Sequence, residues 1–135
     1  MLALSLTQPG PAEPERERPV ALVVDDDRLI RGCVARALRA SGLEAVTASD
    51  GLEALALLAR SGLVPDLVLT DLEMPGLDGA GLLARLRRIP ALAAVPVVLL
   101  TASDAPCPGV TARLAKPFTL EELRRVARLA AAPRG

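Results

Sequence analysis

The chain has 135 residues, and its sixteen basic and sixteen acidic side chains give a formal net charge of zero, so a broad nucleic-acid surface with clustered positive charge is not expected. Hydrophobic residues make up 51% of the chain, but Phe118 is the single aromatic residue, which predicts an aliphatic core and no recognition by base stacking. Because the sequence contains no histidine, histidine metal sites, histidine general bases and Ser-His triads are excluded.

The sequence also indicates in which compartment the protein is expected. No apolar run approaches the ~18 residues that a membrane span needs, so no membrane contact is expected. The first ten residues lack the basic region and long apolar core of a signal peptide. Cys33 and Cys107 are isolated and form no CxxC pair. We therefore expect reduced thiols and a cytoplasmic protein.

The N-terminal residues 1–18 differ in composition from everything that follows. They hold three prolines, one glycine and a run of alternating charges, Glu15 to Arg18. Such a composition cannot build a packed element, and it predicts a flexible tail. The remaining length suits one domain, expected over residues 19–132.

The first expected element is a strand over residues 20–24, VALVV, whose unbroken apolar run is typical of a strand buried on both faces of a parallel sheet. It ends in three carboxylates, Asp25 to Asp27. A helix is expected next, capped by Asp27 and closed by Ser41-Gly42. Its apolar residues recur at helical spacing, and they are Leu29, Ile30, Cys33, Val34, Ala37 and Leu38.

The same alternation continues along the chain. Further strands are expected over residues 43–48, 66–71 and 95–101, and further helices over residues 52–61 and 79–89. Pro106 and Pro108 make a helix improbable between residues 104 and 109. A short edge strand over residues 110–115 and a last helix over residues 120–130, capped by Thr119, complete the pattern. Alternating strands and helices predict an α/β fold with a doubly wound parallel five-stranded sheet.

Polar side chains stand where the predicted strands end, and they are Asp25, Asp26, Asp71, Thr101 and Lys116. The carboxyl ends of parallel strands meet at one edge of a sheet. Neighbouring carboxylates repel one another unless a cation lies among them, and Mg²⁺ prefers such oxygen ligands. Lysine and threonine side chains supply charge and a hydrogen bond to phosphoryl oxygens. Each residue alone could also be an ordinary cap, strand exit or strand residue.

The chemistry that this set favours is uptake of a phosphoryl group by a carboxylate. No P-loop and no GxGxxG is present, so a bound nucleotide is not indicated. The simplest alternative is an aspartyl phosphate on one of the carboxylates.

Four stretches in this chain carry a resemblance to a known family: VVDDD (Val23 to Asp27), LVLTDLEMPGLDG (Leu67 to Gly79), VVLLTA (Val97 to Ala102) and KPF (Lys116 to Phe118). Over roughly residues 19–130 the sequence resembles the receiver domain of two-component response regulators, with the stretches in the family's order. The resemblance implies a flavodoxin-like sheet with strand order 2-1-3-4-5.

The resemblance also implies roles for individual residues. Asp71 matches the phosphoacceptor. Asp26 matches the direct Mg²⁺ ligand, Asp25 matches its partner that acts through water, and Glu73 stands where the family donates a backbone carbonyl to the metal. The implied cofactor is Mg²⁺.

Two more positions match the family's phosphoryl-binding groups. Thr101 corresponds to the hydroxyl that turns toward the phosphoryl group, and Lys116 to the lysine that contacts a phosphoryl oxygen. The implied donor is a phosphohistidine on a histidine kinase or a histidine phosphotransfer protein, and the output is contact with a downstream protein, without direct nucleic-acid binding. Such a domain is not an enzyme, although it assists its own phosphotransfer and dephosphorylation.

Two departures from the family pattern concern how the signal leaves the site. Arg113 stands where the family has an aromatic switch residue, three positions before the motif lysine. Only residues 102–115 separate Thr101 from Lys116, and they must also hold the fifth strand. We therefore expect the fourth helix to be shortened or replaced by a loop. Arg113 is expected to stay outside, or to lean toward the acidic site and pair with a carboxylate or the phosphoryl group.

Three functions remain open from the sequence. The leading one is a stand-alone, phosphorylatable receiver. A pseudo-receiver would bind a partner without phosphorylation, although the set of Asp25, Asp26, Asp71, Thr101 and Lys116 is complete. A small phosphatase would use Asp71 as nucleophile with Glu73 in the place of a second aspartate, although no cap domain or substrate pocket is indicated.

Overall fold

A computed structural model describes residues 18–131 of the chain. Its core is one parallel sheet in the order β2-β1-β3-β4-β5, which confirms the predicted fold class and strand order. The strands are β1 (Val20–Val24), β2 (Glu44–Ala48), β3 (Leu67–Asp71), β4 (Val97–Thr101) and β5 (Ala112–Ala115). Residues 1–17 of the predicted tail, and residue 132 at the predicted end of the domain, lie outside the described residues.

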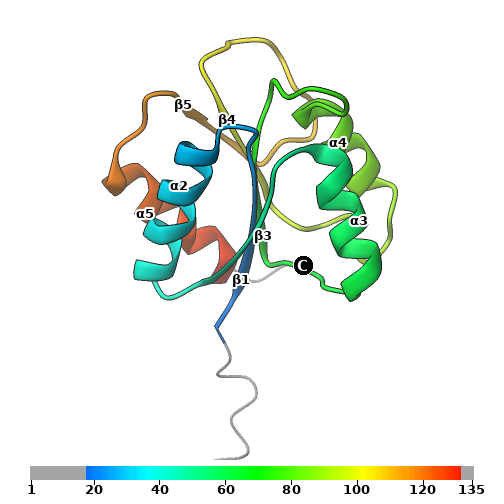
Figure 1. Cartoon of the computed structure of the whole chain (residues 1–135), viewed down its shortest axis with the longest axis horizontal. Helices are drawn as coiled ribbons and strands as arrows, with labels where there is room; N and C mark the ends of the chain where they lie inside the picture. The colour runs from blue at the N-terminus through cyan, green and yellow to red at the C-terminus, as the bar shows by residue number, and fades with distance from the viewer. Residues whose placement is uncertain (1–17, 132–135) are drawn as a thin grey trace, which may run out of the picture.

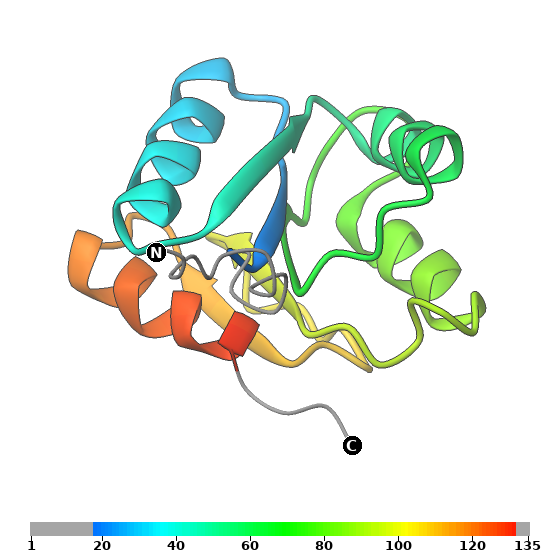
Figure 2. The same ribbon diagram turned by 90° about the horizontal axis from the view of Figure 1, so that it is seen from below.

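Helices cover both faces of the sheet: α2 and α5 lie on one side, α3 and α4 on the other (Figures 1 and 2). Their bounds are α2 (Arg28–Ala40), α3 (Gly51–Ser61), α4 (Gly79–Arg87) and α5 (Leu120–Ala127), the last continuing as the 3₁₀ turn η2 (Arg128–Ala131). Across residues 18–131, no helix has the length and apolar character needed to cross a membrane.

Each α-helix begins at a side chain that accepts a hydrogen bond from the first turn. The four caps are Asp27, Asp50, Asp78 and Thr119. Thr119 forms a full capping box with Glu122, because each side chain also accepts from the other's backbone amide. A cap of this kind is worth about 1 kcal/mol to its helix. The structure confirms the predicted caps at Asp27 and Thr119.

The helix layers explain why the central strands β3 and β4 are buried throughout. Every residue of β3 and β4 is buried, since both faces of the sheet are covered. One core cluster joins the sheet to α3 and α4, and the other joins it to α2 and α5.

The predicted apolar stripe of α2 is wrong at two positions. Val34 and Leu38 are fully buried, but Leu29 is 75% exposed and Cys33 is also exposed. Helical spacing admits a stripe wide enough to include Leu29 and Cys33, whereas the sheet and α5 cover a narrower one. The outer side of α2 therefore carries an apolar and a thiol group toward solvent.

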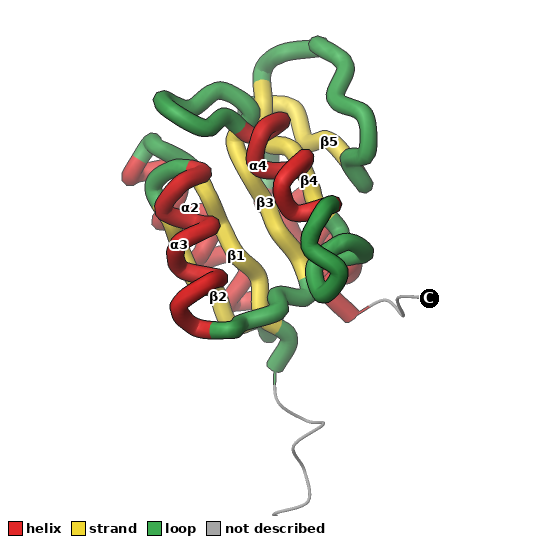
Figure 3. Tube along the Cα trace, turned by 90° about the vertical axis from the view of Figure 1, so that its right-hand side faces the viewer, coloured by secondary structure: helices red, strands yellow, loops and turns green. Residues whose placement is uncertain are grey.

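The connection between β4 and β5 is a loop with no helical turn, as the two prolines predicted (Figure 3). Cys107 is buried in the core cluster on the side of α3 and α4. Gly109 adopts a positive φ of 89°, and its carbonyl accepts a hydrogen bond from Arg87 of α4 at 3.0 Å. The loop thus contributes a thiol to the core where the family would place a helix.

Gly79 fixes the loop after β3 by allowing a close backbone approach. Its amide donates to the Leu72 carbonyl at 2.8 Å, and a Cβ at this position would lie 2.9 Å from Leu72 Cα and collide with the Asp71 carbonyl. We expect Gly79→Ala to lower the free energy of unfolding by about 2–4 kcal/mol, because both obstacles are backbone. Urea denaturation followed by far-UV circular dichroism measures the loss.

Gly32→Ala provides the matched control, since a Cβ there meets nothing within 4 Å on the exposed side of α2. That variant should gain up to about 1 kcal/mol, because alanine is the better helix former. Equal stability of the two variants would contradict the steric account of Gly79.

Candidate functional site

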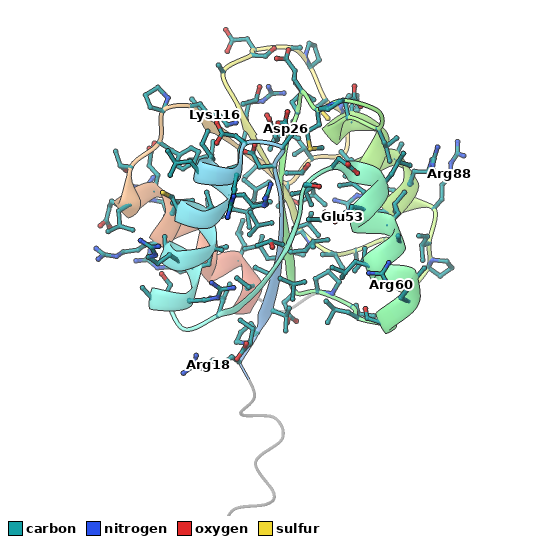
Figure 4. All side chains as sticks on the ribbon, viewed as in Figure 1. Arg18, Asp26, Glu53, Arg60, Arg88 and Lys116 are labelled. Carbon is teal, nitrogen blue, oxygen red and sulfur yellow. The ribbon has the colours of Figure 1, made fainter. Side chains whose placement is uncertain are left out.

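The strand register brings the predicted site residues to one edge of the sheet. Val24 pairs with Thr70, so Asp25 lies beside Asp71. Asp71 pairs with Leu100, which places Thr101 one residue farther along the neighbouring strand. Figure 4 shows Asp26 and Lys116 at the same end of the molecule, opposite Arg18. Parallel strands share one direction, and this alone collects groups that are far apart in the sequence.

Asp25 lies at the bottom of the site and has no exposed surface. Its Oδ1 accepts a hydrogen bond from the Asp27 amide at 2.9 Å, and its Oδ2 lies 3.2 Å from Lys116 Nζ. Arg31 donates to the Asp25 carbonyl at 2.7 Å. Both carboxylate oxygens therefore have partners, as a buried charge requires.

Arg31 is a residue that the sequence reasoning missed. It stands one turn into α2, and its amide donates to the Asp27 carbonyl. Helical side chains point back toward the N-terminus, so a long side chain there can reach the acidic turn before the helix. Its position four residues after Asp27, in the first turn of the predicted helix, could have indicated that its side chain reaches the acidic turn.

Lys116 bridges two carboxylates, since its Nζ lies 3.2 Å from Asp25 Oδ2 and 3.4 Å from Asp71 Oδ1. Partial burial by itself would lower the pKa of Lys116. The attraction of Asp25 and Asp71 outweighs burial, and the pKa is raised above its ordinary 10.5. The ammonium group is therefore firmly charged at neutral pH.

For Asp71, burial outweighs the attraction of the opposite charge, which is the reverse of the result for Lys116. Burial and the Asp25 carboxylate raise its pKa above the ordinary 3.8, although Lys116 and the Glu73 amide pull it down. The Glu73 amide donates to Asp71 Oδ1 at 3.4 Å. Asp71 is 9% exposed, so its side chain lies among charges with a small part of its surface open to solvent.

The three carboxylates could hold a hard metal ion. Asp25, Asp26 and Asp71 each offer one oxygen, and these oxygens lie within 4.8 Å of one another. Lys116 is the cation paired with this group, so the set carries a net charge of about −2 when ionised. Asp26 is exposed and would leave room for water ligands. Carboxylates plus water suit Mg²⁺, so this donor set fits the metal. The role of the Glu73 carbonyl stays a prediction, because its recorded contact is made by its amide.

Thr101 and Arg113 take positions that the sequence left open. Thr101 is 3% exposed, and its Oγ1 accepts a hydrogen bond from the Ser103 amide at 2.9 Å. Arg113 is half-buried and donates to the carbonyls of Ser103 and Ala105. In this structure its guanidinium binds these backbone carbonyls, through one part-buried and one exposed hydrogen bond, and it pairs with no carboxylate among the described residues. That Arg113 stays outside, or pairs with the phosphoryl group, stays a prediction.

Comparison with known proteins agrees with this geometry. The model of the response regulator receiver domain matches residues 21–128. The chain belongs to this family.

Among curated relatives, the receiver domain is 40% identical over 114 residues to the DNA-binding transcriptional regulator NtrC of Salmonella typhimurium, covering 78% of this chain and 23% of that protein. It is also 40% identical over 109 residues to the response regulator MprA of a Mycobacterium species, covering 76% of this chain and 46% of the relative. The chain thus spans less than half the length of either relative.

Among solved structures, the receiver domain resembles the chemotaxis response regulator CheY4 of Vibrio cholerae. The TM-score is 0.76 and the identity 31%, with 84% of this chain and 98% of that chain covered. The similarity therefore extends over nearly the whole of a receiver structure, despite the loop between β4 and β5.

Proposed function

We propose that this receiver domain takes a phosphoryl group from a phosphohistidine donor onto Asp71, with Mg²⁺, and signals through protein–protein contacts. The observation that carries the proposal is the bridge of Lys116 between Asp25 and Asp71, with Asp26 beside them. A turn with only a structural role would not need neighbouring carboxylates, because their mutual repulsion lowers the stability of the fold. Such a cluster is typical of a functional site.

Each residue has a distinct task in the proposed transfer. A carboxylate oxygen of Asp71 attacks the phosphorus atom and forms an acyl phosphate, while the bond from phosphorus to the donor nitrogen breaks and its electron pair stays with the imidazole. Lys116 lies 3.4 Å from Asp71 and can pair with a phosphoryl oxygen bound there. The Thr101 hydroxyl supplies a hydrogen bond from the neighbouring strand.

Asp25, Asp26 and Asp71 would hold the metal, with the Glu73 carbonyl as the further predicted ligand. Bound Mg²⁺ supplies positive charge against the phosphoryl oxygens. The protein's own contribution is to hold the carboxylates at fixed positions on rigid strand ends, so that little rearrangement is needed when the group arrives.

The partners and setting belong to the same proposal. A histidine kinase or phosphotransfer protein would donate the group, and a downstream protein would read the result, in the cytoplasm and without direct nucleic-acid contact. The chain itself would not be an enzyme. What the longer relatives do with their other domains is not carried over, since this chain matches only part of them.

Incubation with acetyl phosphate and Mg²⁺, followed by intact mass measurement, tests the proposal. We expect one phosphoryl adduct that requires Mg²⁺. No adduct would favour a pseudo-receiver, and steady phosphate release at enzymatic rates would favour a phosphatase. In Asp26→Asn, calorimetric titration should show Mg²⁺ affinity weakened at least about tenfold, because a charged oxygen ligand is lost.

Asp27→Asn is the matched control for that loss. It removes the same charge one residue away, but Asp27 caps α2 through its Oδ1 and does not join the cluster. Asparagine caps a helix as well as aspartate does, so the fold should be kept. Equal weakening of Mg²⁺ binding in both variants would contradict a specific metal site.

A further inference from the structure

The residue at the family's aromatic switch position, Arg113, forms a clamp on the loop that begins at Thr101. Its Nη1 donates to the Ser103 carbonyl at 2.9 Å, and its Nη2 donates to the Ala105 carbonyl. A guanidinium presents its donors in a rigid planar fork, which suits two carbonyls on one turn of backbone. Arg113 itself is fixed by β5, where it pairs with Leu99 of β4.

Together with Thr101, Arg113 attaches the start of this loop to the rest of the chain. Among the described residues, the hydrogen bonds that residues 103–106 make with other parts of the chain are those to Thr101 and Arg113. The remaining bond, from the Ala105 amide to Ser103 Oγ, is internal. Ala105 and Pro106 are exposed, so burial does not fix them instead. The end of the loop, by contrast, is held by Cys107 and by Arg87.

The same turn of backbone orients the Thr101 hydroxyl. The Ser103 amide donates to Thr101 Oγ1 at 2.9 Å, while the Ser103 carbonyl receives Arg113. A hydroxyl has one proton to donate and two lone pairs. The Ser103 amide occupies one lone pair of Thr101 Oγ1, which restrains the hydroxyl on its acceptor side while its proton stays available for a phosphoryl oxygen. Fixing Ser103 from both sides therefore fixes the group that would bind the phosphoryl oxygen.

We propose that Arg113 is a positioning residue for phosphoryl transfer, which holds the Thr101 hydroxyl in place through the backbone of Ser103 and Ala105. The inference rests on the proposed function of Asp71. In this chain, hydrogen bonds through the loop backbone would link Thr101 to the edge strand β5. They would take the place of the aromatic side chain that the family has at this position.

The test compares phosphorylation rate constants with acetyl phosphate in the full chain. We expect Arg113→Ala to lower the rate constant about tenfold, the effect of losing one well-placed hydrogen bond. Thr101→Ala should lower it at least as much. The double variant should match Thr101→Ala alone, because Arg113 acts through Thr101. Mg²⁺ affinity should stay unchanged in all three, since the carboxylates are untouched.

Arg87→Ala is the matched control, because Arg87 also donates to a carbonyl of this loop but at its far end, Gly109. Its rate constant should stay within about twofold of the unmodified chain while its stability falls. Arg113→Lys should recover part of the rate, since one ammonium can reach one carbonyl. It also keeps the test valid if the alanine variant does not fold. Amide exchange should show the Ser103 amide losing protection in Arg113→Ala and keeping it in Arg87→Ala.

The outcomes separate the two proposals. A chain that takes no phosphoryl group would overturn the proposed function together with this inference. A phosphorylated chain whose Arg113 variants transfer at unchanged rates would overturn the inference alone. An added loss from Arg113→Ala in the Thr101→Ala background would do the same, because Arg113 would then act by general destabilisation.

Discussion

Asp71→Asn should take up no phosphoryl group from acetyl phosphate, and at pH 7 it should be more stable than the unmodified chain. Asparagine has no carboxylate to attack phosphorus, so intact mass should show no adduct. The gain in stability follows from the environment of Asp71, whose burial and nearness to Asp25 disfavour its charge. We expect a gain on the order of 1 kcal/mol, limited by solvent screening and by the lost attraction to Lys116.

The pH dependence of that gain has a defined sign. The pKa of Asp71 in the folded chain lies above the ordinary 3.8, so the folded state binds its proton more tightly than the unfolded state does. Its contribution is therefore favourable at low pH and is lost as the pH rises through the folded pKa. The advantage of Asp71→Asn should be present at neutral pH and should disappear below about pH 4.

Urea denaturation at several pH values measures this difference. An Asp71→Asn variant that is less stable than the unmodified chain at pH 7 would show that the ion pair with Lys116 outweighs burial. An adduct that persists in the variant would show that another carboxylate is the acceptor.

Removing the bridging cation should have the largest effect on stability. In Lys116→Ala, the fully buried Asp25 and the neighbouring Asp71 lose their common partner. We expect the free energy of unfolding to fall by about 2–4 kcal/mol, because a buried charge is left uncompensated. The rate of phosphorylation should fall about a hundredfold or more, the usual cost of losing one charged group that stabilises a transition state.

The pH and metal dependence identify the cause of the loss. The pKa of Lys116 is raised in the folded chain, so its stabilising contribution is complete below its ordinary 10.5 and is lost as the pH rises through the higher folded value. As the pH rises from neutral, the stability gap between Lys116→Ala and the unmodified chain should therefore narrow only when the pH becomes strongly alkaline. Added Mg²⁺ should narrow it at neutral pH, because the ion binds the folded carboxylates.

Arg124→Ala is the matched control for a salt bridge. Arg124 pairs with Glu121 at 3.4 Å, but both side chains are more than half exposed. Its loss should cost less than about 0.5 kcal/mol. A Lys116→Ala variant that is no less stable than Arg124→Ala would contradict the bridging role of Lys116.

Much of the fold could be read from local patterns. The unbroken apolar runs of β1, β3 and β4 require cover on both faces, and capping residues mark where the helices begin. The loop between β4 and β5 was also readable, because Pro106 and Pro108 cannot lie inside a helix. What the pattern could not settle was how wide a stripe of α2 the sheet would cover, so Leu29 and Cys33 were misassigned.

The sequence by itself determined which residues meet at the site. Asp71 and Thr101 end their strands, and Asp25 and Lys116 directly follow theirs. The common direction of parallel strands gathers such residues at one edge whatever their separation along the chain. The tertiary structure alone decided how they interact. That Lys116 joins Asp25 to Asp71 depends on the register of strands that are neighbours only in space.

The interactions of Arg113 could not be predicted from the sequence either. Its sequence position shows that an aromatic residue is absent, but not what its guanidinium binds. The partners of Arg113 are backbone carbonyls, which every residue carries and no sequence pattern singles out. Which carbonyls lie within reach depends on the path of the loop, and only the tertiary structure gives that path.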